Sequence, residues 1–164
     1  MKRAIVFDSS TLILLAKISL LRDVSQEMKV IITDIVENEA TKKDVYDAKV
    51  IKELIKEGII EVVKAGQNSL SKIRNDFGIE SGEASSLALA IKNRCMLAVD
   101  DWQTMKACIV LGTDFTTAVH FVVRLYKRGL LDKKTVMEKL SGLEKHGWYE
   151  RRIIEDAKQR VKGD

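Results

Sequence analysis

Two apolar stretches of this chain end in carboxylates. The stretch RAIVFD ends at Asp8, and the stretch CMLAVDD ends at the adjacent pair Asp100 and Asp101. Carboxylates that cluster repel one another and raise one another's pKa unless a cation lies among them. All-oxygen ligand sets suit hard Mg²⁺ or Mn²⁺ rather than zinc. If the fold brings these acids together, they predict a divalent-cation site.

Glutamates elsewhere in the chain can complete such a site. Glu83 lies in the first turn of a predicted helix that begins at Ser81. Glu37 and Glu39 lie in the acidic stretch that follows the second apolar run. Each acid also has a purely structural interpretation, because Asp caps helices and Glu stabilises a helix N-terminus through the macrodipole. The joint pattern, rather than any single acid, carries the functional interpretation.

A carboxylate-bound Mg²⁺ suits phosphate chemistry, because the ion can activate a water and stabilise charge on the leaving oxygen. The two histidines are poor candidates for catalytic bases. His120 lies in the apolar stretch AVHFVV, where we expect a packed or snorkelling side chain, and His146 lies near a helix end. No Gly-rich turn follows Asp8, which excludes a P-loop or dinucleotide fingerprint. Metal-activated water is therefore the leading mechanism.

The elements that must position these acids alternate between short β-rich runs and longer helical patterns. We predict strands over residues 3–8, 29–33, 59–65, 95–100 and 108–113. We predict helices over residues 9–24, 34–42, 44–58, 69–78, 80–94, 101–107, 115–129, 132–147 and 149–162. This alternation implies an α/β fold, a three-layer α/β/α sandwich with a central parallel sheet of about five strands. Because ligands bind beyond the carboxyl ends of parallel strands, the acids should converge on one edge of the sheet.

Composition and charge narrow the class of protein further. The 164 residues are most simply one domain, and 46% hydrophobic with 32% charged residues indicates a globular chain. Asp8 interrupts the first apolar run and no transmembrane-length stretch follows, so we expect a cytoplasmic protein without a membrane partner. Cys95 and Cys108 are isolated in apolar surroundings, where we expect buried free thiols. The net charge of +4 is a mild basic bias, compatible with a polyanionic partner.

Five motifs carry a resemblance to a known family. In chain order they are IVFDSSTLILLAK, VIITDIVENEA, GEASSLALA, LAVDD and VLGTDF with a later RGLL, and together they resemble a PIN-domain ribonuclease of the prokaryotic branch. The resemblance runs from Arg3 to about Leu131. We therefore expect one PIN-like domain over residues 1–164, with a core over about 1–131 and a helical C-terminal extension over 132–164.

The resemblance implies a parallel sheet flanked by helices and a metal-dependent nuclease that acts on RNA. Many members of the family are toxins of VapBC-type toxin–antitoxin pairs, which makes an antitoxin protein a candidate partner. Position by position, the resemblance implies catalytic carboxylates at Asp8, Glu39, Glu83, Asp100 and Asp101. It implies that Mg²⁺ or Mn²⁺ is bound by Asp8, Glu83, Asp100 and Asp101. Glu37 remains as an off-register alternative to Glu39.

Other positions match the family pattern less closely. Ser9, Ser10 and Thr113 match hydroxyl positions that can support ligands or phosphate. Asp34 stands where many relatives have Pro, and Asp114 is a further acid that either joins the cluster or is a bystander. Since all the expected acids are present, the resemblance implies an active member of the family.

From this pattern we expect a metal-dependent endoribonuclease that hydrolyses RNA phosphodiester bonds by metal-activated water. The alternative is a non-catalytic PIN-like module that binds RNA or a protein through the same edge. A third reading is a phosphatase for small phosphoesters.

Two sets of basic residues in the C-terminal part of the chain are of the type that contacts nucleic acid. They are Arg124, Lys127, Arg128, Lys133 and Lys134, and then Arg151, Arg152, Lys158, Arg160 and Lys162. The second set is interleaved with acids, as on an exposed helix face with i,i+4 pairs. The apolar residues of AVHFVVRLYKRGLL are expected to pack in the core, with a homodimer interface as the second interpretation.

Overall fold

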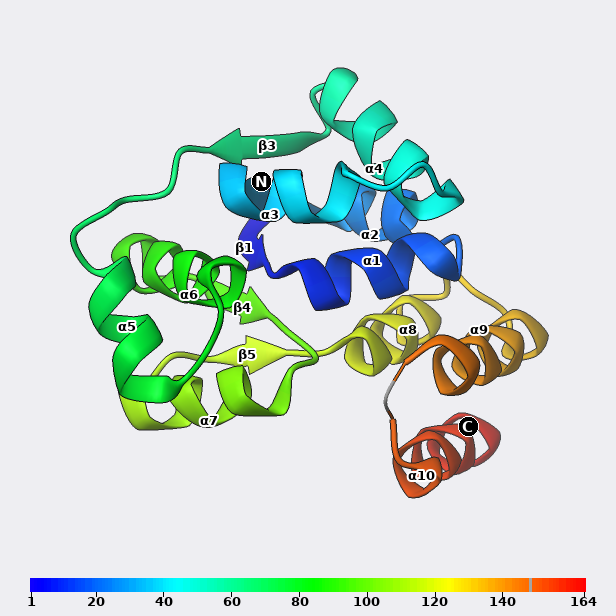
Figure 1. Ribbon diagram of the computed structural model, residues 1–164. Helices are drawn as coiled ribbons and strands as arrows, with labels where there is room; N and C mark the ends of the chain where they lie inside the picture. Colours follow the sequence, from blue (N-terminus) through cyan, green and yellow to red (C-terminus); the bar gives the residue numbers. More distant parts are fainter. Residues whose placement is uncertain (148) are drawn as a thin grey trace.

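A parallel sheet with a central first strand organises the domain. In the computed structural model, which describes residues 1–147 and 149–164, the sheet has five strands in the order β3-β2-β1-β4-β5 (Figure 1). Their bounds are β1 (Arg3–Phe7), β2 (Met28–Thr33), β3 (Ile60–Val63), β4 (Met96–Ala98) and β5 (Phe115–Thr116). The chain runs outward from β1 through β2 to β3 and then returns to β4 on the other side of β1. The strand order therefore reverses between β1 and β4, which is the place where open α/β sheets bind ligands.

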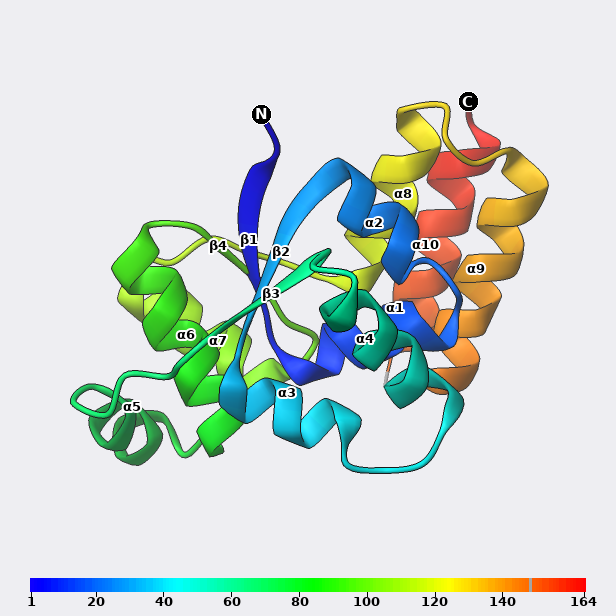
Figure 2. The ribbon, with the colours of Figure 1, turned by 90° about the horizontal axis from the view of Figure 1, so that it is seen from above.

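Helices cover both faces of the sheet. Their bounds are α1 (Ser9–Lys17), α2 (Leu21–Glu27), α3 (Asp34–Thr41), α4 (Tyr46–Lys56), α5 (Leu70–Phe77), α6 (Ser81–Asn93), α7 (Trp102–Leu111), α8 (Ala118–Lys127), α9 (Lys133–His146) and α10 (Arg151–Lys162). Ile5 and Phe7 of β1 pack in one core with α1, α2, α8 and α9, whereas Val6 packs in a second core with α6 and α7. Figure 2 shows α5, α6 and α7 on one side of the sheet and α1, α2 and α8 to α10 on the other. The predicted three-layer α/β/α sandwich is confirmed.

The fifth strand was predicted in the wrong place. Residues 108–113 form the end of α7 and the turn after it, and the strand is Phe115–Thr116. The run CIVL has β-branched residues, but Asp101 starts a helix that continues through it, burying Cys108 and exposing Ile109. The helix ends at Gly112, whose φ of +67° suits glycine.

The first predicted helix, over residues 9–24, is divided in two. Ser19 has a φ of +58° between α1 and α2, a left-handed conformation that interrupts the helical hydrogen bonding. The Ser19 N–H donates to the carbonyl of Ala16 at 3.1 Å, and the Leu20 N–H donates to Leu15 at 2.9 Å. These bonds close the end of α1 and turn α2 back toward the start of β2.

The C-terminal helices belong to the same core as the sheet. Leu140 and Leu143 of α9 and Ile154 of α10 are fully buried in the core that also holds Phe7. The ring of Phe7 stacks on that of Phe121 in α8, with ring centroids 5.3 Å apart. The part of the chain that the structure describes contains no helix that is both long and apolar enough to cross a membrane.

Truncation of Leu140 should therefore destabilise the whole domain. We expect Leu140→Ala to lower the free energy of unfolding by about 2–5 kcal/mol, because it leaves a cavity in a fully buried site. Urea unfolding followed by circular dichroism measures this change, and it should remain a single transition. Leu130→Ala, at a leucine that is 53% exposed, is the matched control and should change stability by less than ~0.5 kcal/mol. A separate early transition in the Leu140 variant would show that α9 and α10 fold apart from the sheet.

Candidate active site

The carboxylates that follow β1 and β4 meet where the strand order reverses. Asp8 is fully buried and its backbone N–H donates to the carbonyl of Ala98 at 2.9 Å, which extends the pairing of the two strands. The Ser10 hydroxyl donates to Asp8 Oδ2 at 2.7 Å and accepts from the backbone N–H of Asp100 at 3.0 Å. Asp8 also caps α1, since its Oδ2 accepts from the Ser10 N–H at 3.4 Å. Asp8 therefore caps α1 and also belongs to the group of carboxylates at this edge of the sheet.

The other oxygen of Asp8 lacks a partner. Asp8 Oδ1 is buried and accepts no hydrogen bond from the described residues. Burial raises the pKa of Asp8 to about 7, against the lowering effect of the Ser10 hydrogen bond, and the charge of Glu83 raises this pKa further. A buried polar atom without a partner is costly, and a cation at this point would remove the cost.

Glu83 lies close to this carboxylate at the start of α6. Its Oε2 accepts from the backbone N–H of Glu80 at 2.8 Å, which forms the reciprocal capping box of the helix. Burial raises the pKa of Glu83, and the charges of Asp101 and Glu39 raise it further. Four acids from separate elements therefore share one electrostatic environment: Asp8, Glu39, Glu83 and Asp101.

Of the two glutamates that the sequence left open, Glu39 is the one whose carboxylate reaches these elements. Its Oε2 accepts from the Ser9 hydroxyl at 3.2 Å. Its carboxylate also lies against Gly82, where a Cβ atom would stand only 2.6 Å from Oε1. A side chain at position 82 would displace this carboxylate, so the glycine of the GEA motif leaves room for Glu39 at the start of α6, the helix that carries Glu83.

Asp100 and Asp101 are engaged in different ways. Asp101 Oδ2 accepts from the N–H and the hydroxyl of Thr104, at 2.9 and 2.8 Å, and so caps α7. Both bonds use Oδ2, which leaves the Oδ1 atom of Asp101 outside the cap. The Asp100 carboxylate instead accepts from the Thr11 hydroxyl at 2.6 Å and the Ala118 N–H at 3.1 Å, both at Oδ2, and from the Tyr149 hydroxyl at Oδ1. Burial raises the pKa of Asp100 to about 6.

Two of these donors were missed in the sequence. Thr11 lies in the first turn of α1, three residues after the N-cap Asp8. This spacing could have indicated that its hydroxyl lies near the carboxylates. Tyr149 stands in the segment before α10, and nothing in the sequence near it indicates a contact with Asp100.

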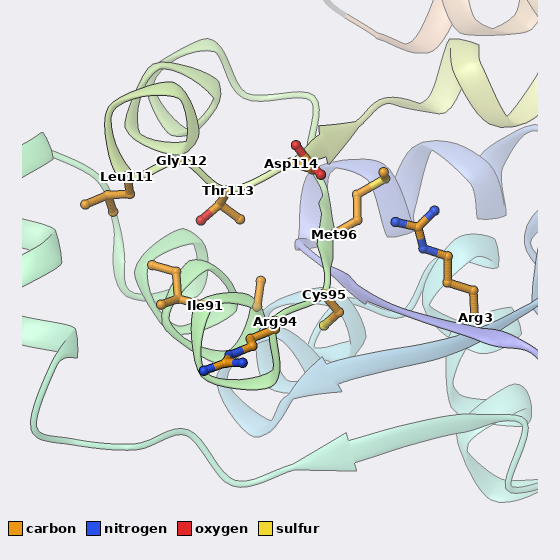
Figure 3. Close-up of a pocket in the computed structure, with 10 residues that line it drawn as sticks. Arg3, Ile91, Arg94, Cys95, Met96, Leu111, Gly112, Thr113 and Asp114 are labelled. Atoms are coloured by element: carbon orange, nitrogen blue, oxygen red, sulfur yellow. The ribbon is translucent and has the colours of Figure 1, made fainter.

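Thr113 and Asp114 lie at the opposite edge of the sheet. Both precede β5, and they line a cavity of about 290 Å³ with Arg3 and Cys95, which stand at or just before the starts of β1 and β4 (Figure 3). The expectation that Thr113 supports the site is therefore wrong, because β5 begins two residues later than the predicted strand ends. Asp114 is a bystander. Cys95 is half-buried rather than buried, whereas Cys108 is buried as predicted.

The first set of late basic residues lies mainly toward that same amino edge. Arg124 and Arg128 line a hollow of about 630 Å³ with Lys2, Arg3 and the exposed His120. Arg128 forms an ion pair with Glu27 at 2.8 Å. In α10, Arg160 pairs with Asp156 at 3.0 Å in the i,i+4 arrangement that the sequence predicts.

The donor chemistry of the carboxyl edge fits a hard cation. As the side chains stand, no three Asp, Glu, His or Cys residues among those described are placed to hold a metal ion together. The acids around Asp8 are nevertheless all oxygen donors. The charge of Glu83 raises the pKa of Asp8, and Asp8 Oδ1 accepts no hydrogen bond from the described residues.

Fold and site together define an α/β domain with carboxylates at the reversal of strand order. The chain belongs to the PIN-domain family: the DUF3368 family, described as a PIN domain, matches residues 4–162. The crystal structure of PAE2754 from Pyrobaculum aerophilum is similar in fold, with a TM-score of 0.52 and 16% identity over 77% of this chain and 99% of that one. Comparison with curated proteins found no match. The predicted family is confirmed, and PIN domains are usually nucleases.

Without a divalent cation, stability should fall as the pH rises toward neutrality. The pKa of Asp8 is about 7 in the folded chain, against an ordinary value of 3.8, and that of Asp100 is about 6. Between pH 3.8 and about pH 7 the folded state keeps protons that the unfolded state has released. Each rise in pH within this range therefore favours unfolding. Above about pH 8, where Asp8 is ionised in both states, its effect is complete.

Comparison with Asp8→Asn isolates this effect. In EDTA at pH 8, we expect this variant to be more stable than the wild type by about 4 kcal/mol, and at pH 4 to lose that advantage. Thermal unfolding across this pH range measures the difference. A stability difference between the two proteins that does not change with pH would show that the pKa of Asp8 is not raised in the folded chain.

Proposed function

We propose that this protein is an Mg²⁺- or Mn²⁺-dependent endoribonuclease. The observation that carries the proposal is the fully buried carboxylate of Asp8, with an unpartnered Oδ1, beside Glu83 at the reversal of strand order in a PIN domain. A carboxylate in this position is destabilising unless a cation or a proton neutralises it. A cation bound beside Asp8 would remove this cost, which supports a metal-binding role for the residue.

The site residues have distinct proposed roles. Asp8, Glu83 and Asp101 would hold the ion, and Glu39 would complete the acidic wall beside Gly82. Asp100, which the sequence analysis placed among the ligands, is assigned to positioning, because both its carboxylate oxygens already accept hydrogen bonds. By these bonds Asp100 fixes α1 and α8 relative to the loop that carries Asp101.

When bound, the ion would supply the water activation and charge neutralisation that phosphodiester hydrolysis requires. The protein's own contribution is to hold the carboxylates before the substrate arrives. Ser9 orients Glu39 at 3.2 Å and Ser10 orients Asp8 at 2.7 Å, so both hydroxyls act within the site. Neither histidine contributes, since His120 is exposed beside the basic hollow and His146 lies in the last turn of α9.

A toxin role with an antitoxin protein partner remains a prediction from the family resemblance. A cytoplasmic location and a homodimer remain predictions from the sequence pattern. A small neighbouring gene for a DNA-binding protein would support the toxin role.

A second candidate function is a non-catalytic module that binds RNA or a protein through the same edge. It is favoured by one observation, that Glu83 and Asp101 are engaged in helix caps rather than gathered around a common point. RNA binding without turnover in the presence of Mg²⁺ or Mn²⁺ would support this alternative.

Cleavage of single-stranded RNA tests the leading proposal. We expect turnover with Mg²⁺ or Mn²⁺, none with EDTA, and a loss of at least about 100-fold in Asp8→Asn and in Asp101→Asn, because each removes a charge that holds the ion. Gel analysis of a labelled RNA measures the rates. Asp114→Asn is the matched control, since it removes the same charge at the opposite edge, and its rate should equal that of the wild type. If cleavage survives in both Asp8 and Asp101 variants, the assigned site is wrong.

A further inference from the structure

An exposed tryptophan stands beside the carboxylate site. Trp102 directly follows Asp101 and is the first residue of α7, with 64% of its surface exposed. Side chains of a helix lean toward its N-terminus, and the N-terminus of α7 lies at the carboxyl edge of the sheet. The indole of Trp102 therefore stands at the rim of the proposed site, exposed to water.

A cation accompanies this ring. The ammonium of Lys106, one helical turn further along α7, lies 5.8 Å from the centre of the Trp102 ring. A flat aromatic surface and a positive charge are thus presented together, next to Asp101. Proteins that hold single-stranded nucleic acid combine these two features, an aromatic ring for a base and a basic residue for the phosphate that joins it.

We propose that Trp102 stacks on an unpaired base of single-stranded RNA and that Lys106 contacts the adjoining phosphate, which positions the strand at the carboxylate site. The inference rests on the proposed nuclease function and specifies its substrate, because only a base that is free of its complementary strand can lie on the ring. Double-stranded RNA keeps its bases stacked within the helix and cannot make this contact.

Exposed apolar residues at the other end of α7 suggest a different occupant, a second protein surface. Ile109 and Val110 are 64% and 72% exposed, and a protein partner covering α7 would use them together with Trp102. RNA is favoured because Trp102 is the one of the three that adjoins Asp101 and carries a cation over its ring. Ile109, equally exposed on the same helix, therefore provides a matched control.

Tryptophan fluorescence tests the contact without depending on turnover. In a Trp148→Phe background, Trp102 is the only tryptophan of the chain. Titration with a short single-stranded RNA in Mg²⁺, read while a gel shows the RNA intact, should quench its emission. Duplex RNA of the same sequence and inorganic polyphosphate, which has no bases, should leave the emission nearly unchanged. Equal quenching by polyphosphate would overturn the stacking proposal.

Affinity measured by anisotropy of labelled RNA, with the natural Trp148 present, gives a second test. We expect Trp102→Ala to weaken binding by about 5- to 150-fold, the loss that follows removal of one base–aromatic stack, and Trp102→Phe to recover part of it. Ile109→Ala should change binding less than about twofold. Lys106→Gln should weaken binding of RNA and polyphosphate alike. Equal losses in the Trp102 and Ile109 alanine variants would contradict the proposal.

The outcomes separate this inference from the nuclease proposal. Quenching without cleavage would contradict the nuclease proposal and support the stacking contact. Cleavage that is unaffected by Trp102→Ala at low RNA concentration would support the nuclease proposal and contradict the stacking contact. A smaller sedimenting mass in both Trp102→Ala and Ile109→Ala would assign this face of α7 to self-association and overturn the inference.

Discussion

The burial of the Asp8 carboxylate is the constraint on which the rest of the site depends. A carboxylate with no access to water is tolerated in a folded protein only when its charge is neutralised or its oxygens are hydrogen-bonded. Here one oxygen is bonded by Ser10, and the other accepts no hydrogen bond from any residue that the structure describes. The same hydroxyl of Ser10 accepts from the backbone of Asp100, so the ends of β1 and β4 are fixed around the unpartnered oxygen.

The surrounding structure separates acids that hold the fold from acids that are free to act. The carboxylate of Asp100 is used to join α1, α8 and the segment before α10, through Thr11, Ala118 and Tyr149. The C-terminal helices are therefore linked to the site as well as to the core. The helix caps formed by Glu83 and Asp101 each contribute only about 1 kcal/mol, so the proposed binding of a cation by these two acids would cost little in helix stability.

Sequence alone gave the positions of the acids after strands and their convergence on one edge, because both follow from parallel pairing. It could not choose between Glu37 and Glu39, since that choice depends on which carboxylate reaches Ser9 and Gly82 in the folded chain. It misplaced β5, because the β-branched residues of CIVL led us to end the predicted helix at residue 107, whereas α7 continues to Leu111. The contact of Tyr149 with Asp100 could not be predicted, because the two residues are 49 positions apart and no local pattern links them.

The most direct test of the account is a crystal structure of the protein soaked with Mn²⁺, read by anomalous scattering. The account predicts an anomalous peak at about 2.2 Å from Asp8 Oδ1, with Glu83 and Asp101 turned out of their caps toward it and Asp100 still bonded to Thr11. A fully soaked crystal with no peak beside Asp8, or with its only peak near Asp114 at the opposite edge, would contradict it.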